Sequence, residues 1–164
     1  MTILTVGDPA PFFRLPSSTG SPVGLDDYRK SRLIVYFYPA ALTPGCTTQA
    51  VDFTASLTEL GSAGLSVVGI SPDPPERLAT FQQRHQISFP LLSDPSLETL
   101  RAYGAYGTRK LYGKQVQAVI RSTFVVDVAA DGQGTIAVAQ YQVRASGHVE
   151  RLKRHLGLTG PDKH

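Results

Sequence analysis

Short apolar runs alternate along this chain with segments of helical period. Residues 33–38 are six consecutive apolar or aromatic positions, and residues 65–71 and 90–92 are two further, predominantly apolar runs. Runs of this length, rich in β-branched and aromatic side chains, are typical of strands that are buried on both faces. The pattern therefore predicts three central strands.

The segments between and after these runs have the spacing of amphipathic helices. In residues 44–60, apolar side chains at positions 50, 53, 57 and 60 share one helical face. The predicted helices cover residues 44–60, a segment that begins at residues 75–76, residues 96–103, and a last segment that Ser146 caps and Gly157 ends. A short strand at residues 12–15 and one helical turn at residues 25–29 precede them.

The second half of the chain predicts a hairpin. Residues 116–128 are expected to form one long strand in which Arg121 shares a side with Val119, Thr123 and Val125. A turn at residues 131–132 connects it to a partner strand at residues 135–143. Residues 104–113 are expected to form a loop because glycine recurs there. Alternating strands and helices followed by a hairpin indicate an α/β fold with a central mixed β-sheet flanked by helices. We expect one domain over residues 1–164.

Composition and charge exclude several classes of protein. The 164 residues contain 16 basic and 13 acidic side chains, and the basic residues are scattered instead of forming a stripe. We therefore expect no nucleic-acid partner. No apolar run reaches the length of a membrane helix, and the first residues do not resemble a secretory signal. With Cys46 as the only cysteine, an internal disulfide and a Cys-x-x-Cys pair are impossible. We expect a cytoplasmic protein with no membrane partner.

The segment around Cys46 carries the candidate chemistry. It joins the carboxyl end of a predicted buried strand to a predicted helix, where ligands bind in open α/β sheets. If Thr43 is the N-cap and Pro44 the first helical residue, Cys46 is the third. Free backbone N–H groups and the helix dipole then favour its thiolate. The alternative is a buried, inert cysteine. Arg121 is a candidate cationic partner, or else an edge-strand surface charge.

No cofactor or metal site is expected. The four histidines are His85, His148, His155 and His164, and no two have metal-ligand spacing. His148 is expected to be a surface or helix-capping residue. Residues 132–134 follow a strand but begin no helix, so they predict a hairpin turn and not a dinucleotide-binding loop.

The motif Pro39-x-x-x-Thr43-x-x-Cys46 resembles the active-site motif of the peroxiredoxins. The surrounding residues 36–39 and 43–48 are similar to the bacterioferritin comigratory protein, or peroxiredoxin Q, subfamily. The resemblance continues through residues 68–73, 89–94, 111–114, 120–127 and 147–149, so it covers nearly the whole chain.

The resemblance implies a thioredoxin-like fold and thiol-dependent peroxidase activity on hydrogen peroxide and organic hydroperoxides. Cys46 would be the peroxidatic cysteine, which is oxidised to a sulfenic acid. Thr43 would hydrogen-bond the peroxide and the sulfur, and Pro39 would shield the pocket from water. Arg121 would stabilise the thiolate and the charge on the leaving oxygen. The subfamily also suggests a monomer or weak dimer.

Three departures from the subfamily pattern change what is expected. Residues 40–42 are Ala-Ala-Leu where the subfamily has Lys-Asp-Asn, which favours organic hydroperoxides. Gln49 replaces a glutamate. Val51 occupies the position of the second cysteine of many members, so this chain resembles a one-cysteine variant. An external thiol, from thioredoxin, glutaredoxin or a low-molecular-weight thiol, would have to reduce the sulfenic acid.

Two other functions remain open at the level of sequence. Cys46 could serve a peroxide-sensing redox switch with slow turnover, because a sensor also needs no resolving cysteine. The chain could instead be a thioredoxin-fold binding module whose cysteine is inert.

Overall fold

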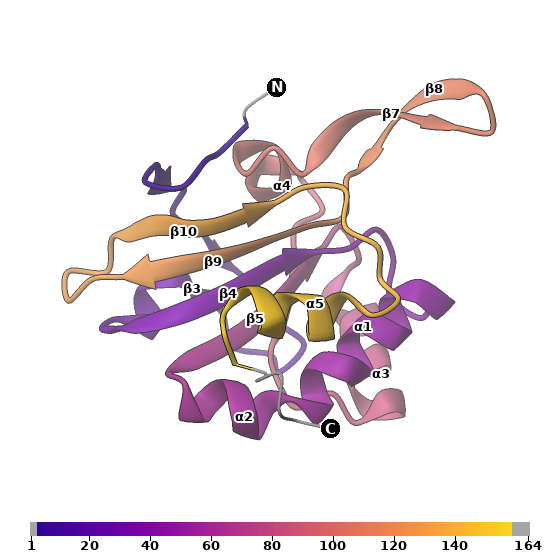
Figure 1. The fold of residues 1–164 in the computed structure, drawn as a ribbon. Coiled ribbons are helices and arrows are strands. Elements are labelled where there is room, and N and C mark those ends of the chain that lie inside the picture. The colour runs from indigo at the N-terminus through magenta and orange to yellow at the C-terminus, as the bar shows by residue number, and fades with distance from the viewer. Residues whose placement is uncertain (1–2, 159–164) are drawn as a thin grey trace.

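A six-stranded mixed sheet forms the centre of the computed structural model, which describes residues 3–158 (Figure 1). Across the sheet the order is β1 (Pro9–Ala10), β10 (Gly134–Gln140), β9 (Ser122–Val128), β4 (Ser31–Phe37), β5 (Leu65–Ser71) and β6 (Leu91–Ser93). Strands β4, β5 and β6 are parallel, and β9 pairs antiparallel with both β4 and β10. The three apolar runs are therefore strands, as predicted. Residues 1–2 and 159–164, which include His164, lie outside the described residues.

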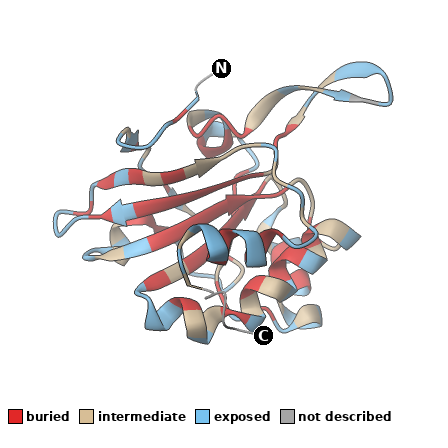
Figure 2. Ribbon diagram, viewed as in Figure 1, coloured by how far each residue is buried: buried red, intermediate tan, exposed pale blue. Residues whose placement is uncertain are grey.

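Alternating side chains of the sheet bury two separate core clusters. Along β4, Ile34 and Tyr36 belong to the first cluster, whereas Leu33 and Val35 belong to the second. Figure 2 shows the central strands almost entirely buried, with exposure concentrated in turns, outer helix faces and the projecting hairpin. Because both faces of β4 are covered, its sequence is a continuous apolar run and not an alternating one.

Helices cover the two faces unequally. The first cluster packs under α1 (Pro44–Ala55), α2 (Leu57–Ser62), α3 (Pro75–His85) and α5 (His148–His155). The second lies under α4 (Glu98–Ala102) and the N-terminal segment, with the short strands β2 (Arg14–Leu15) and β3 (Val23–Gly24) and the 3-10 turn η1 (Leu25–Tyr28). Figure 1 shows α4 on the opposite side of the sheet from α1 and α5.

The predicted single helix over residues 44–60 is wrong, because the helix is interrupted at Ser56. The Ser56 N–H donates to Phe53 O at 3.0 Å, which tightens the last turn of α1. Its buried hydroxyl accepts a hydrogen bond from Lys153 Nζ of α5 at 3.3 Å. A tertiary contact therefore fixes this break, and the helical period of the sequence continues across it.

The predicted strand over residues 116–128 is also wrong. Strand β8 (Lys114–Val119) pairs with β7 (Tyr106–Leu111) in a projecting two-stranded arm, where a loop was expected, and β9 starts at Ser122. Between them the Ile120 N–H donates to Ala105 O and the Val143 N–H donates to Arg121 O. The chain thus changes hydrogen-bonding partners at residues 120–121. As a result Val119 and Val125 pack in different clusters instead of sharing one side.

Smaller differences concern element ends. Strand β10 ends at Gln140 and not at residue 143, and α4 is shorter than the predicted helix over residues 96–103. The last helix begins at His148, and its N-cap is Gly147 with a φ of 71°, so Ser146 is not its cap. Within the described residues no helix is both long enough and apolar enough to span a membrane.

Candidate active site

The start of α1 places Cys46 where the sequence predicts. Thr43 is the N-cap in an extended conformation, Pro44 is the first helical residue and Cys46 the third. The first helical hydrogen bond runs from the Thr47 N–H to Thr43 O at 2.9 Å. The N–H groups of Gly45 and Cys46 have no acceptor within the helix, because Thr47 is the first residue whose N–H can reach a carbonyl four positions earlier. Since this turn contains no acidic residue, the sulfur lies at the unneutralised positive end of the helix.

Thr43 makes no side-chain cap. Its hydroxyl donates to Ala40 O at 2.7 Å, which closes the loop that precedes the helix. The Thr43 proton is thereby engaged, and the oxygen lone pairs are left to accept a hydrogen bond. In this structure the hydroxyl does not donate to the Cys46 sulfur.

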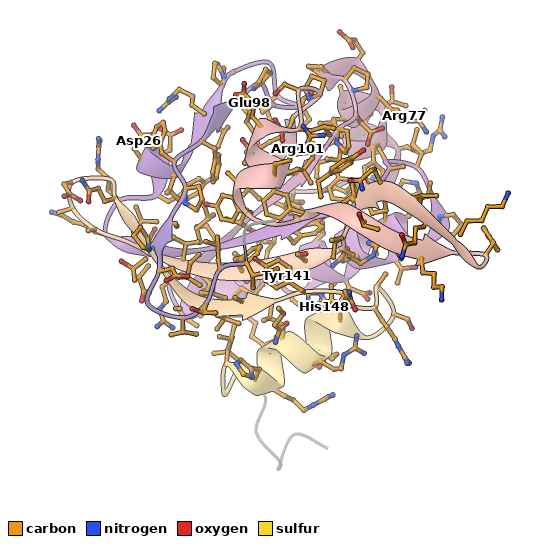
Figure 3. All side chains as sticks on the ribbon, turned by 90° about the horizontal axis from the view of Figure 1, so that it is seen from above. Asp26, Arg77, Glu98, Arg101, Tyr141 and His148 are labelled. Carbon is orange, nitrogen blue, oxygen red and sulfur yellow. The ribbon has the colours of Figure 1, made fainter. Side chains whose placement is uncertain are left out.

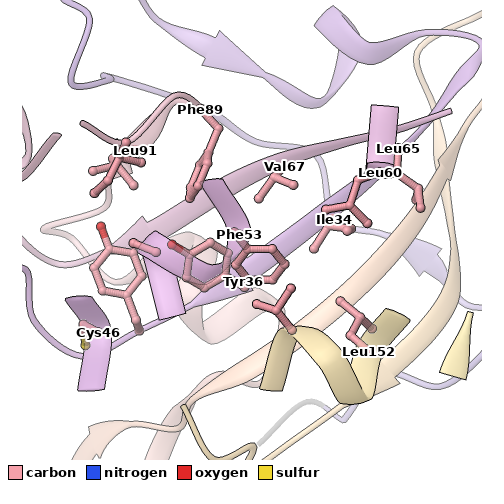
Figure 4. Packing of buried hydrophobic residues seen from close by; sticks show 14 of the residues in the cluster. Ile34, Tyr36, Cys46, Phe53, Leu60, Leu65, Val67, Phe89, Leu91 and Leu152 are labelled. Atoms are coloured by element: carbon pink, nitrogen blue, oxygen red, sulfur yellow. The ribbon is translucent and has the colours of Figure 1, made fainter. Parts of the chain in front are cut away.

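Cys46 is almost completely buried, with 1% of its surface exposed. It belongs to the first core cluster together with Tyr36, Tyr38 and Phe53, and Figure 4 shows it at one end of that cluster. The Tyr36 and Phe53 rings stack with centroids 4.7 Å apart. Burial raises the pKa of Tyr36 well above its ordinary value, and the Tyr38 pKa is raised for the same reason. The surroundings of the sulfur are therefore neutral and aromatic on this side.

Arg121 supplies the cation. Its Nη2 donates to Cys46 Sγ at 3.4 Å, and its Nη1 donates to Gln49 Oε1 at 2.7 Å. The break between β8 and β9 removes Arg121 from any sheet face and lets its side chain extend over the first turn of α1. A Cβ added at Gly45 would lie 3.4 Å from Nη2, so the guanidinium fits closely against this turn. Arg121 is partly buried and is not an edge-strand surface charge.

Gln49 connects Arg121 to His148. The Gln49 side chain is fully buried, and its Nε2 lies 3.1 Å from Nδ1 of His148. Because the Gln49 carbonyl accepts from Arg121, its amide must donate to the histidine, which requires Nδ1 to be unprotonated. Burial lowers the pKa of His148 to about 4, and Arg151 and Arg121 contribute to that shift. The expectation of a surface or capping histidine is wrong: His148 is 1% exposed and packs edge-on against Phe53.

The loop over residues 39–43 is anchored by Asp73 of the β5–α3 connection and by Arg77 in the first turn of α3. The Ala41 N–H donates to Asp73 Oδ2 at 2.7 Å, and Arg77 Nη2 donates to Ala41 O at 3.1 Å. Arg77 also pairs with Asp73, Nε to Oδ1, at 3.2 Å. Within the loop Leu42 has a φ of 67°, a conformation that is uncommon for a bulky side chain. The anchors on both sides of Ala41 hold this backbone in place.

The structure therefore brings Thr43, Cys46 and Arg121 to the start of one helix, and half-buried Pro39 begins the loop that leads to it. His148 and Asp73 were not predicted as parts of this site. Both lie in stretches that carry the family resemblance, and that is the only sequence signal that could have identified them. Among the described residues, no group of three or more His, Cys, Asp and Glu side chains could hold a metal ion.

Comparison with known proteins shows the family of this chain. Residues 6–137 match the model of the AhpC/TSA family. The chain is 59% identical over 157 residues to a putative peroxiredoxin of Mycobacterium tuberculosis, covering 96% of this chain and 98% of that protein. It is 41% identical over 133 residues to peroxiredoxin Bcp of Escherichia coli, covering 81% and 84%.

A solved structure extends the similarity to the fold. It is that of the Xanthomonas campestris bacterioferritin comigratory protein, an enzyme with alkyl peroxide reduction activity. It superposes with a TM-score of 0.80 at 32% identity, over 88% of this chain and 90% of that one. The fold is therefore the thioredoxin-like fold of the peroxiredoxins, as the resemblance implies. This chain belongs to the AhpC/TSA family and is a thiol-dependent peroxidase of the peroxiredoxin type.

Proposed function

We propose that Cys46 is the peroxidatic cysteine, and that the enzyme reduces hydrogen peroxide and organic hydroperoxides through a sulfenic acid that an external thiol reduces. The observation that carries the proposal is the 3.4 Å contact between Arg121 Nη2 and Cys46 Sγ at the N-terminus of α1. A cation and free backbone N–H groups both favour the thiolate, which is the nucleophilic form of cysteine.

The oxidative step is a displacement at oxygen. The Cys46 thiolate attacks one peroxide oxygen, an S–O bond forms and the O–O bond breaks. The leaving oxygen departs as hydroxide or alkoxide and takes a proton, which gives water or an alcohol. Arg121 lies beside the sulfur and can stabilise the charge that moves onto the leaving oxygen. Donors that are already positioned where charge develops are the expected source of rate.

Thr43 and Pro39 define the peroxide position in this proposal. Because the Thr43 hydroxyl donates to Ala40 O, its oxygen is arranged to accept a hydrogen bond from the peroxide O–H. Pro39 carries no N–H and lies at the start of the anchored loop, where it would exclude water. The loop residues Ala40, Ala41 and Leu42 are apolar, which supports organic hydroperoxides as substrates, and the Xanthomonas relative reduces alkyl peroxides.

Reduction of the oxidised enzyme needs a partner molecule. Cys46 is the only cysteine of the chain, and Val51 stands where many relatives have their second. The sulfenic acid therefore has no thiol to condense with inside the molecule. An external thiol, available in a reducing cytoplasm, completes the cycle. Because Cys46 is 1% exposed, that thiol reaches the sulfur only when the first turn of α1 opens.

Steady-state peroxide consumption tests the proposal. We expect sustained turnover with added thiols in the parent protein and none in Cys46→Ser. A panel of thioredoxin, glutaredoxin with glutathione, and small thiols identifies the reductant. Consumption that stops after one equivalent of peroxide with every reductant would instead support the peroxide-sensing switch.

A further inference from the structure

A cavity of about 590 Å³ borders the candidate active site through Arg121. Its walls come from β7 of the projecting arm (Thr108, Arg109, Lys110), from the β8–β9 break, and from residues 142–144 that follow β10. The volume is within the usual range for sites that hold small molecules, about 300–1,000 Å³. Cys46 is not among the lining residues, so Arg121 is the group that the cavity and the sulfur share.

The lining of this cavity has one sign of charge. It contains Arg109, Lys110, Arg121 and Arg144, and no aspartate or glutamate. A second cavity of about 500 Å³ shares residues 142–144 with the first and adds Arg151, again without a carboxylate. Figure 3 labels Tyr141 and His148, which both line this second cavity.

Among the described residues, no carboxylate neutralises these cations: Arg109 and Arg151 donate to backbone carbonyls, and Arg121 donates to Gln49 and Cys46. Over residues 3–158, ion pairs join carboxylates to Arg14, Arg29, Arg32, Arg77 and Lys153, and none involves the five basic side chains of the two cavities. The whole chain has only three more basic than acidic residues, so this is a local accumulation. Clefts lined by one sign of charge concentrate counter-ions, and arginine matches a carboxylate with two parallel hydrogen bonds.

We infer that this basic cavity is the docking site of the external reductant, and that the reductant is a low-molecular-weight thiol bearing a carboxylate. The inference rests on the proposed function, which requires an outside thiol in every cycle. Hydrogen peroxide and simple alkyl hydroperoxides are uncharged, so neither substrate gives a reason for a cavity lined by cations. A thiol derived from cysteine, by contrast, ordinarily carries a carboxylate. With that carboxylate held near Lys110 and Arg144, the thiol is kept on the Arg121 side of Cys46 and can attack the sulfur when the first turn of α1 opens.

The chemistry of reduction balances with two thiols. The first, as its thiolate, attacks the Cys46 sulfur; an S–S bond forms, the S–O bond breaks, and the hydroxide takes a proton to become water. The second attacks the reductant sulfur of this mixed disulfide and releases the Cys46 thiolate. Cys46 is reduced, and the two thiols are oxidised to one disulfide. The cavity acts by raising the local concentration of the first thiol.

A matched pair of reductants and a matched pair of variants test the inference. The reductants are β-mercaptopropionate and its methyl ester, which differ in the carboxylate charge. The test variant is Lys110→Gln with Arg144→Gln, and the control is Arg84→Gln with Lys114→Gln. All four positions are exposed, both variants lose two charges, and the control positions do not line either cavity. The measurement is the rate of sulfenic acid reduction, followed by quenched-flow mass spectrometry.

We expect the rate ratio of mercaptopropionate over its ester to fall about tenfold in the test variant and to stay at the parent value in the control. Added salt should reduce the parent ratio, because ions screen the attraction. Equal losses for both reductants, or the same fall in the control, would overturn the inference. The inference would also be overturned if the test variant slowed only the oxidation of Cys46 by a carboxylate-bearing hydroperoxide and left the rate of sulfenic acid reduction unchanged. Turnover with the neutral ester tests the proposed function separately.

Discussion

Replacement of Arg121 by alanine removes the cation beside the sulfur. At the observed Nη2–Sγ distance of 3.4 Å, two unit charges in surroundings with an effective dielectric constant of about 20 attract by about 5 kcal/mol. The guanidinium charge is delocalised and Arg121 is only partly buried, so this is an upper value. One positioned donor in an active site contributes about 3 kcal/mol to the transition state. We therefore expect Arg121→Ala to slow peroxide reduction by about a hundredfold or more.

The assay is the second-order rate of Cys46 oxidation, measured by quenched flow with increasing hydrogen peroxide. Arg121→Lys should recover only part of the rate, because a point charge cannot reach Sγ and Gln49 Oε1 at once as the planar guanidinium does. Arg84→Ala, which removes an exposed arginine of α3, is the control and should react like the parent. Rates for Arg121→Ala within a few-fold of the parent would refute the role given to Arg121.

Three further predictions concern the surroundings of this pair. Gln49→Leu leaves Arg121 Nη1 without its acceptor and should slow peroxide reduction about tenfold. Gln49→Glu keeps an acceptor for Arg121 and should keep most of the rate. Equal rates for the two variants would contradict the positioning of Arg121 by Gln49. His148 binds a proton near pH 6.5 when unfolded but only near pH 4 when folded, so its contribution to the free energy of unfolding should be complete above pH 6.5 and decrease by up to about 3 kcal/mol between pH 6.5 and pH 4. Urea unfolding at several pH values checks this, and His148→Asn should flatten the decrease. Val51→Cys should form an internal disulfide with Cys46 after peroxide treatment and slow overoxidation, although residues five apart on a helix point in different directions and the first turns of α1 must unwind. Overoxidation of Val51→Cys as fast as in the parent would show that α1 does not open there.

Local signals were sufficient to predict the start of α1. Pro44 favours the first helical position, and Thr43 is the extended N-cap although its side chain makes no cap, so the third helical position of Cys46 followed from neighbouring residues. The buried strands β4 and β5 were equally clear, because strands covered on both faces are continuous apolar runs.

Features that depend on tertiary partners were not predictable in this way. The β7–β8 arm buries little on either side, so it has no hydrophobic pattern to distinguish it from a loop. The strand break at residues 120–121 depends on Ala105 and Val143, which are distant in sequence. His148 is buried because it packs against Gln49 and Phe53 of α1, and the sequence around a single histidine does not reveal such partners on another helix.

Intact mass spectrometry during stepwise peroxide addition, without any thiol, tests the central claim most directly. If Cys46 is an activated peroxidatic cysteine with no internal partner, the first equivalent of peroxide adds one oxygen atom to Cys46, and excess peroxide adds a second. A thiol supplied after the first step should restore the starting mass. A disulfide-linked dimer as the main oxidised product, or a Cys46 that reacts no faster than free cysteine, would contradict the account.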